Sequence, residues 1–246
     1  MSAAADPATR LGPFPARVRA VEPLGGLARI LLDPDPRVDL GQAGQFHMVR
    51  NPAGRDVLGR PVGLIRFADG PGLVVDPASA AGDMAGPELS LVGPLGRGFD
   101  LSGVDAETTL LVAAGFGVTV MPAVAAARPG IRLVSGFRQS DHAALLDIVT
   151  GAACDAPRIA PDLVTEPLEA ALTSGRYTQV LAAGPTGLGR AVAERCRAAG
   201  VTSQIALEAP MACGFGGCYG CAVELDGAPR RLCIEGPVVD GARLVA

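Results

Sequence analysis

Four of the six cysteines in this 246-residue chain lie close together near its carboxyl end. Cys213, Cys218 and Cys221 have the spacing C-x4-C-x2-C, and Cys233 follows after eleven further residues. Three thiolate ligands on one short loop and a fourth from elsewhere form the plant-type arrangement for a [2Fe-2S] cluster. Zinc is a second interpretation, although structural zinc sites usually take their ligands from two short paired loops. A third is a set of reduced thiols without any metal.

Glycines separate these cysteines. They are Gly214, Gly216, Gly217 and Gly220. Because glycine has no Cβ, the loop can fold tightly and direct backbone N–H groups at the sulfur atoms of a cluster. The following stretch, "AVELDGAPRRLCIEG", predicts a hairpin that turns at Asp226-Gly227 and returns Cys233 to the loop. We therefore predict an iron-sulfur centre with Cys213, Cys218, Cys221 and Cys233 as its ligands.

The remaining cysteines do not extend this cluster. Cys196 shares one face of a predicted helix with Leu188, Val192 and Ala199, which indicates a core residue. Cys154 stands alone in a loop-like stretch, and we assign it no function.

The two histidines give no catalytic centre. His47 occupies an alternating position of a predicted strand, where packing or exposure accounts for it. His142 lies beside Asp141 at a predicted helix start, where capping or solvation accounts for it. We assign no catalytic residue to this chain.

The elements that must position the cysteines fall into three units, so the fold class is multi-domain α/β plus β. Residues 1–103 contain six short apolar runs bounded by Pro, Gly and Asp, which predict an N-terminal antiparallel β-barrel. Residues 104–207 alternate strands with helices, which predicts a central parallel-sheet α/β nucleotide-binding domain. Residues 208–246 form a small C-terminal [2Fe-2S] domain.

Composition narrows the possible partners and location. Hydrophobic residues make up 49% of the chain, charged residues 19%, and the net charge is -4. No lysine- or arginine-rich run is present, so we expect no nucleic-acid partner. No apolar run approaches the roughly 20 residues of a membrane span, so we expect no membrane insertion and a cytoplasmic location. In that reducing compartment clustered cysteines favour metal binding over disulfides.

The motif "LEAPMACGFGGCYGCAVEL" followed by "RRLCIEGPVVD" resembles the carboxy-terminal signature of the electron-transfer subunit of class 1B dihydroorotate dehydrogenase, a ferredoxin-reductase-like family. Weaker matches occur in order along the chain. They are "GQF" at 44–46, "RPVGLI" at 60–65, "GPLGRGF" at 93–99, "AAGFGVTVMPAV" at 113–124, "SGFR" at 135–138 and "AAGP" at 182–185. A similar group, the flavin subunits of NADPH-dependent ferredoxin oxidoreductases, has aspartate at the first ligand position, so Cys213 favours the dihydroorotate group.

This resemblance implies that NADH reduces FAD in the barrel and that the [2Fe-2S] cluster carries single electrons to a partner. The partner would be an FMN-containing dihydroorotate dehydrogenase catalytic subunit of pyrimidine biosynthesis, in a hetero-oligomer. A flavin suits this position because it exchanges electrons in pairs or singly. The implied cofactor-binding residues are Arg60, Pro61, Val62, Gly63, Gly93, Pro94, Leu95, Gly115, Gly117, Gly184 and Pro185.

Some positions depart from the family pattern. Gly63 stands where a hydroxyl residue is expected, and "LVVDPASAAGDMAGPEL" lacks the paired glycine and threonine that would hold the flavin pyrophosphate. Ala183 replaces a common cysteine, and "GAACDAPRIAPDLVTE" lacks the family's glycine-rich D-G-S loop. An exposed arginine without a role remains the alternative for Arg60, and a tight turn without a ligand remains the alternative for Gly115 to Gly117.

These departures motivate a second hypothesis, a degenerate iron-sulfur relay or accessory subunit that has lost its flavin site, its nicotinamide site or both. A zinc-stabilised interaction module is a third hypothesis.

Overall fold

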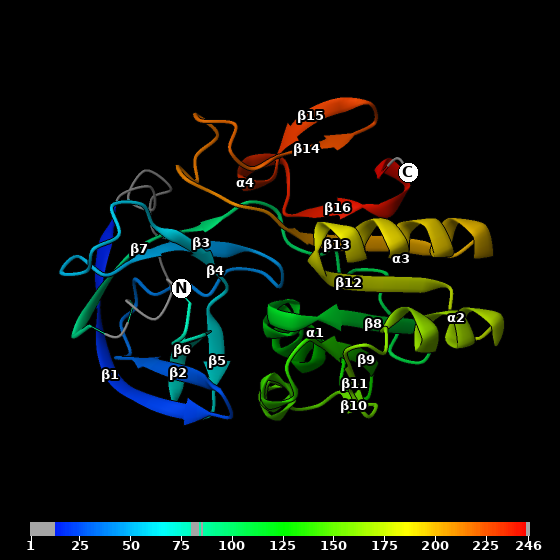
Figure 1. The fold of residues 1–246 in the computed structure, drawn as a ribbon, viewed down its shortest axis with the longest axis horizontal. Coiled ribbons are helices and arrows are strands. Elements are labelled where there is room, and N and C mark those ends of the chain that lie inside the picture. Colours follow the sequence, from blue (N-terminus) through cyan, green and yellow to red (C-terminus); the bar gives the residue numbers. More distant parts are fainter. Residues whose placement is uncertain (1–12, 80–83, 85, 245–246) are drawn as a thin grey trace, which may run out of the picture.

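The computed structural model describes residues 13–79, 84 and 86–244. Two large sheets lie side by side, and a two-stranded hairpin extends beyond the second (Figure 1). One sheet is antiparallel, and the other is parallel apart from one strand. This layout confirms the predicted fold class of an antiparallel β unit, a parallel-sheet α/β unit and a small carboxy-terminal segment.

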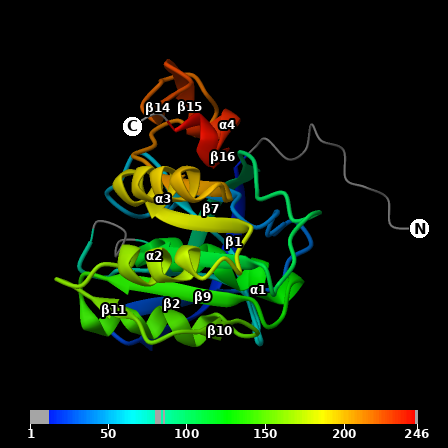
Figure 2. The same ribbon diagram turned by 90° about the vertical axis from the view of Figure 1, so that its right-hand side faces the viewer.

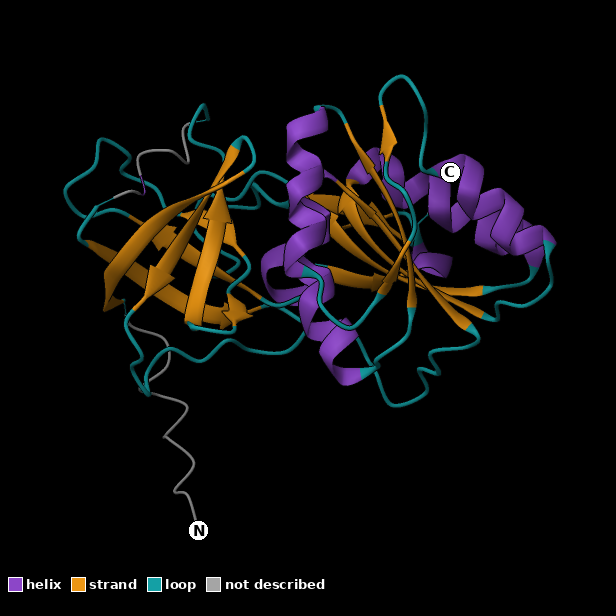
Figure 3. Ribbon diagram, turned by 90° about the horizontal axis from the view of Figure 1, so that it is seen from below, coloured by secondary structure: helices purple, strands orange, loops and turns teal. Residues whose placement is uncertain are grey.

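The first sheet is antiparallel, with the strand order β4-β3-β7-β1-β2-β6-β5. Its strands are β1 (Phe14–Leu24), β2 (Leu27–Leu32), β3 (Phe46–Arg50), β4 (Arg60–Val62), β5 (Ile65–Phe67), β6 (Gly70–Val75) and β7 (Glu88–Leu95). The two edge strands, β4 and β5, are separated in the chain only by Gly63 and Leu64. The sheet must therefore curve until its edges approach one another, which gives the barrel at one end of the molecule in Figure 3. One of the six apolar runs that predict this unit is "PVGLIRF", which indicates a single strand, but Gly63 and Leu64 divide it between β4 and β5.

The second sheet has the order β10-β9-β8-β12-β13-β16, and β11 also pairs with β9. Its strands are β8 (Thr109–Ala114), β9 (Arg132–Phe137), β10 (Ala153–Cys154), β11 (Arg158–Ile159), β12 (Gln179–Pro185), β13 (Thr202–Glu208) and β16 (Val238–Asp240). All pairs are parallel except β13 with β16. Parallel neighbours need crossover connections, and the helices between the strands supply them.

Helices cover both faces of this sheet, as the turned view shows (Figure 2). The helical segments are η3 (Gly115–Val120), α1 (Met121–Ala127), η4 (Ser140–Ile148), α2 (Thr165–Thr173), α3 (Thr186–Ala199), α4 (Leu232–Glu235) and η5 (Gly241–Arg243). Successive residues of β8 serve opposite faces: Leu110 joins the core under α2 and α3, whereas Leu111 joins the core under α1. Strands buried on both faces read as continuous apolar runs, which is why the sequence identified this domain.

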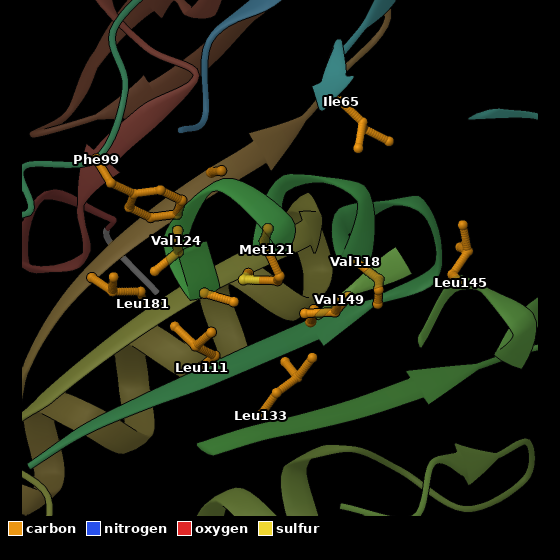
Figure 4. Packing of buried hydrophobic residues seen from close by; sticks show 14 of the residues in the cluster. Ile65, Phe99, Leu111, Val118, Met121, Val124, Leu133, Leu145, Val149 and Leu181 are labelled. Atoms are coloured by element: carbon orange, nitrogen blue, oxygen red, sulfur yellow. The ribbon is translucent and has the colours of Figure 1, made fainter. Parts of the chain in front are cut away.

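The core under α1 extends into the barrel. Leu111, Met121 and Val124 pack in one cluster with Ile65 and Phe99 from the first 103 residues (Figure 4). The two sheets therefore share apolar contacts, which holds the barrel and the α/β layer in one arrangement.

Two predicted helices differ in detail. The predicted helix after the Gly115 turn begins as the 3-10 segment η3, and the α-helix proper starts only at Met121, beside Pro122. Proline is tolerated there because the first helical N–H groups have no partner within the helix. The predicted helix near His142 is 3-10 throughout. None of the helices in the described residues has the length and apolar composition needed to cross a bilayer.

The predicted hairpin after the third cysteine is confirmed. Strands β14 (Ala222–Leu225) and β15 (Ala228–Arg231) pair antiparallel, and their two-residue turn has positive φ at both Asp226 (53°) and Gly227 (72°). This is the conformation that a two-residue hairpin of matching twist requires. The predicted division into residues 1–103, 104–207 and 208–246 stays a prediction; β16, beyond the hairpin, lies in the central sheet.

Candidate cofactor pocket and iron-sulfur centre

A cavity of about 590 Å³ lies between the barrel and the carboxyl ends of β8, β12 and β13. Parallel sheets bind ligands at this edge, because the loops after the strands diverge there and leave a crevice. The volume lies within the range of small-molecule and cofactor sites.

Seven of the predicted cofactor-binding residues line this one pocket. They are Arg60, Pro61, Val62 and Gly63 from the barrel, and Gly117, Gly184 and Pro185 from the α/β domain. The other four predicted residues are not among those that line it. Gly93, Pro94 and Leu95 lie in β7, and Gly115 opens η3 with a φ of +54°. The structure therefore brings together residues that are more than a hundred positions apart in the chain.

On the barrel side of the pocket, Arg60 forms an ion pair, whereas Gly63 faces open space. Arg60 donates to Asp56 through Nε and Nη2, and both side chains are about 40% exposed. Such an exposed ion pair contributes little to stability, so the guanidinium can be drawn to a stronger anionic partner at small cost. A Cβ at Gly63 would meet no atom within 4 Å, so the missing hydroxyl side chain leaves open space in the pocket wall.

On the α/β side, two glycines allow the backbone to come close to the pocket. A Cβ on Gly117 would collide with the carbonyl of Ala183, so η3 lies directly against β12. Gly184 has a φ of +150°, which residues with a Cβ rarely adopt. These contacts explain why both positions are glycine without any ligand.

Of the two segments that depart from the family pattern, one contributes to the pocket wall and the other does not. The segment at 73–89 lies partly outside the described residues, but Asp76, Ser79 and Met84 belong to the pocket wall. The stretch that lacks the D-G-S loop forms the short strands β10 and β11 at the sheet edge, with Cys154 exposed.

The histidines lie away from this pocket wall. His47 is fully buried in β3. Burial lowers its pKa to about 4, and the nearby Asp39 opposes this shift only in part. His142 has no capping role at η4, contrary to one expectation; its ring packs edge-on against Phe116, with centroids 6.1 Å apart. Cys196 is buried in the core, as predicted.

Glu208 is a pocket residue that our sequence analysis missed. It is the last residue of β13, it lines the cavity, and part of its surface meets solvent. Glu208 is exposed as a whole residue, but desolvation by the surrounding protein raises the pKa of its carboxyl to about 7. The available signal was its place at the carboxyl end of a parallel strand, where functional groups of such sheets gather.

The four predicted ligand cysteines lie immediately beyond Glu208, in two pairs. The side chains of Cys213 and Cys218 are hydrogen-bonded to each other, and so are those of Cys221 and Cys233; all four are free cysteines. Cys218 is exposed and Cys213 is half-buried, whereas Cys221 and Cys233 are buried. One pair therefore lies at the surface and the other pair faces the core.

Backbone N–H groups point at these sulfur atoms, as the glycine-rich loop predicts. Burial acts to raise the pKa of the Cys213 thiol, but hydrogen bonds outweigh it and lower this pKa to about 6. The donors are the backbone groups of Cys218, Phe215 and Gly217 and the Cys218 thiol. Burial, followed by the hydrogen bond and charge of Cys221, raises the pKa of Cys233 to about 11. The backbone of Cys233 also donates to Cys221 Sγ, at 3.4 Å.

In the described residues no group of three or more His, Cys, Asp or Glu side chains is arranged to hold one metal ion. A [2Fe-2S] cluster makes a different demand, because each of its two irons takes two thiolates and the bridging sulfides lie between them. The pairs Cys213 with Cys218 and Cys221 with Cys233 fit that division. The donor set and the surrounding N–H groups therefore suit a two-iron cluster.

Close packing seats the cysteine loop on its neighbours. Gly214, with φ +76°, faces Met48 of the barrel, and a Cβ there would collide with Met48 Cγ. Gly216, with φ +84°, packs in the same way against Ile234. Arg231 donates to the Gly216 carbonyl at 3.0 Å. The loop thus contacts the barrel on one side and the segment that carries Cys233 on the other.

Comparison with known proteins identifies the carboxy-terminal segment. The iron-sulfur cluster binding domain of dihydroorotate dehydrogenase B matches residues 208–245. The dihydroorotate dehydrogenase B (NAD(+)) electron transfer subunit of Geobacillus kaustophilus is 30% identical over 230 residues, which cover 84% of this chain and 88% of the relative. The chain belongs to the family of dihydroorotate dehydrogenase B electron transfer subunits.

Other members of the electron transfer subunit family match at similar distance. The subunit of Clostridium perfringens is 28% identical over 240 residues, covering 90% of this chain and 93% of the relative. Among solved structures, an NADH-dependent reduced ferredoxin-NADP oxidoreductase superposes with a TM-score of 0.74 at 21% identity, covering 93% of this chain and 88% of that chain. Ferredoxin-NADP+ reductase from Plasmodium falciparum gives a TM-score of 0.59 at 8% identity, covering 75% and 92%. These structures show that the subunit has the ferredoxin-reductase fold.

Membership of this family confirms the resemblance drawn from the cysteine motif. The match over residues 208–245 to an iron-sulfur binding domain favours the cluster over the zinc interpretation.

Proposed function

We propose that the chain passes electrons from NADH, through FAD in the 590 Å³ pocket, to a [2Fe-2S] cluster and on to a dihydroorotate dehydrogenase catalytic subunit. The relatives are named as electron transfer subunits of that NAD(+)-linked enzyme. Oxidation of dihydroorotate would then take place on the catalytic subunit, which we propose to carry FMN and to serve pyrimidine biosynthesis.

One observation carries this proposal: the pocket and the cysteine loop are joined by a single short segment. Glu208 belongs to the pocket wall, and so do Ala209, Pro210 and Met211, which lead directly to Cys213. A ligand in the pocket would therefore lie next to the loop that holds the cluster. Electron transfer between two cofactors requires that they lie close together.

The two thiol pairs, Cys213 with Cys218 and Cys221 with Cys233, would hold the cluster. The backbone N–H groups of the loop would stabilise the negatively charged sulfur atoms. The cluster, once bound, supplies one-electron exchange.

The proposed flavin site uses the barrel side of the pocket. Arg60 would contact a phosphate, for which guanidinium is well suited, and the backbone at Gly63 would lie near the ring. The α/β side, with Gly117 and Gly184, would receive the nicotinamide nucleotide. We propose the three units 1–103, 104–207 and 208–246 for flavin, nicotinamide and cluster, in that order.

The proposed docking face for the catalytic subunit surrounds the cluster ligands. Three large apolar side chains are exposed there: Phe215 (72%), Tyr219 (55%) and Ile234 (39%). Each lies within two residues of a proposed ligand, and Arg231 stacks over the Tyr219 ring at 4.8 Å. Exposed aromatic groups beside an arginine are typical of the centre of a protein interface. We propose a cytoplasmic location, where thiolates stay reduced.

Anaerobic purification with a visible spectrum, cofactor extraction and iron and sulfide analysis tests this function. We expect FAD, two irons and two sulfides per chain, and bleaching of the cluster absorption when NADH is added. Iron-sulfur colour without extractable flavin would support the degenerate relay instead, and a colourless zinc protein would contradict both.

A further inference from the structure

A second cavity, of about 490 Å³, lies against helix α2 at the edge of the central sheet. It has no lining residue in common with the cofactor pocket. Tyr177, in its wall, comes two residues before β12, whereas Gly184 and Pro185 at the other end of β12 line the cofactor pocket. The two cavities are therefore separate sites, and the proposed function gives the second one no role.

Positive charge gathers in the wall of this second cavity. Arg132 opens β9, Arg158 opens β11, and Arg176 lies between α2 and β12, and all three line the cavity. Asp155 is the one carboxylate among the described wall residues. Three guanidinium groups and one carboxylate leave two positive charges uncompensated, and a concave surface with such an excess attracts anions.

Arg132 is the fixed member of this group. Asp155 accepts from its Nε at 3.0 Å and from its Nη2 at 2.6 Å, and this paired contact sets the plane of the guanidinium. Its Nη1 donates to the Tyr177 hydroxyl at 3.3 Å. Tyr177 is only 4% exposed, and its hydroxyl proton has no acceptor among the described residues. A buried donor of this kind is costly unless it meets an acceptor, so it offers a hydrogen bond to a bound anion.

The other two arginines have donors to spare. The Arg158 side chain makes no hydrogen bond, ion pair or ring contact with any described residue. Arg176 donates from Nε to the Glu107 carbonyl at 2.9 Å and lies over the Tyr177 ring at 5.5 Å. Both of its terminal nitrogens lack a described acceptor. Planar guanidinium groups with free N–H donors match the oxygen atoms of a phosphate group.

The remaining wall is apolar and comes from one face of α2. Pro167, Ala170 and Ala171 lie there at helical spacing. The cavity volume falls in the range of sites for whole organic molecules, so an apolar body can accompany the anionic group. A phosphate monoester carries a charge near −2 at neutral pH, which equals the uncompensated positive charge of the wall.

We propose that this cavity binds a small phosphate monoester. Arg158, Arg176 and the Tyr177 hydroxyl bind the phosphate group, and the face of α2 contacts the apolar body. Arg132 is a positioning residue, because it is held by Asp155 and in turn holds Tyr177.

The test is binding calorimetry on the full chain with its cofactors, at neutral pH and constant ionic strength. Phenyl phosphate is the main probe. Inorganic phosphate offers the charge without the apolar body, and benzoate offers the ring with a carboxylate. The variants are Arg158→Gln and Arg176→Gln, and the control is Arg66→Gln. Arg66 is exposed on β5 of the barrel, and its side chain also contacts no described residue.

We expect wild type and Arg66→Gln to bind one phenyl phosphate per chain, and to bind inorganic phosphate and benzoate about tenfold more weakly. Arg158→Gln and Arg176→Gln should each weaken phenyl phosphate binding about tenfold or more, as for a lost hydrogen bond to a charged group. Wild-type affinity in Arg158→Gln would overturn the site. Equal weakening in Arg66→Gln would overturn it too, because total charge would then explain the binding.

The two comparison probes test the class of ligand. Inorganic phosphate or benzoate that binds as tightly as phenyl phosphate would overturn the choice of a monoester. Tyr177→Phe keeps the buried ring and removes the hydroxyl, so it should also weaken phenyl phosphate binding, whereas unchanged affinity would contradict the role of the hydroxyl.

Arg158→Lys decides the case in which Arg158→Gln does not fold. Lysine retains the charge but lacks the planar set of donors, so phenyl phosphate should bind several-fold more weakly. Wild-type affinity in this variant would contradict the contact. None of these measurements involves electron transfer, so their outcome is independent of the proposed function.

Discussion

Gly214 of the cysteine loop lies directly against Met48 of barrel strand β3. A Cβ at position 214 would collide with Met48 Cγ, and the φ of +76° already disfavours any residue with a side chain. Gly214→Ala should therefore displace the loop and lower the iron and sulfide bound per chain at least twofold, since backbone strain of this kind costs about 1–3 kcal/mol. The matched control is Gly220→Ala, because a Cβ there would stand 3.5 Å from Cys218 Sγ, an ordinary contact. Equal iron loss in both variants would contradict this reading of the loop.

Cys218 is the exposed member of the outer thiol pair. Cys218→Ser should bleach the iron-sulfur absorption and stop electron delivery to the catalytic subunit while leaving flavin bound, because the flavin pocket does not include this residue. Cys154→Ser, at an exposed cysteine on β10, is the control and should change neither iron content nor colour. Iron analysis and visible spectra of the three proteins check the prediction, and full iron content in Cys218→Ser would refute the ligand assignment.

Gly63 leaves open space in the pocket wall, so Gly63→Ser should fold with little change in stability, within about 0.5 kcal/mol. If its hydroxyl meets the flavin, affinity should rise roughly two- to tenfold, the value of one hydrogen bond. Gly117→Ser is the contrasting variant, because its Cβ would collide with Ala183, and it should unfold at lower temperature. Flavin titration and thermal unfolding measure both effects; a destabilised Gly63→Ser would show that the wall is not open.

His47 should make the fold sensitive to mild acid. Burial lowers its folded-state pKa to about 4, whereas an unfolded histidine titrates near 6.5, so the unfolded chain binds more protons between these values. Stability from this group is complete above pH 6.5 and is lost as pH falls towards 4, by on the order of 3 kcal/mol. Urea unfolding at pH 7 and pH 5 should show a smaller loss in His47→Gln than in wild type. Equal losses would exclude His47 as the cause.

Glu208 should change the stability of the fold with pH in the opposite direction to His47. Its folded-state pKa of about 7 exceeds that of an unfolded glutamate, so the folded chain binds more protons and stability falls as pH rises from about 4.5 to 7. Glu208→Gln should therefore unfold at a higher temperature than wild type at pH 8, with no such gain at pH 4. Thermal unfolding at the two pH values checks this sign, and a gain of equal size at both would point to another cause.

Phe215 should anchor the catalytic subunit if docking occurs around the cluster. Phe215→Ser should weaken the complex about tenfold or more, as expected for a central aromatic residue of an interface. Leu163→Ser is the control, because Leu163 is similarly exposed (61%) but precedes α2 on the α/β domain. Sedimentation of each variant with the catalytic subunit measures the affinity, and equal weakening would place the interface elsewhere.

Much of this arrangement could be predicted from the sequence, because the strongest sequence signals depend on neighbouring residues. Cysteine spacing, the Asp226-Gly227 turn and the apolar strands such as β8 each depend on a few neighbouring residues. The split of one predicted strand at Gly63 and the 3-10 form of η4 depend on tertiary packing, so they were not foreseen. Glu208 was missed for the same reason: a glutamate gains an unusual pKa only from the pocket that the fold builds around it.

Strand β16 pairs with β13, the same strand that leads into the cysteine loop. The segment that carries the cysteines is thus attached to β13 both where it begins and where it ends, so we expect it to hold a fixed position relative to this sheet. The gap over which an electron would travel from pocket to metal is consequently set by strand pairing, so the transfer rate should be insensitive to solvent viscosity.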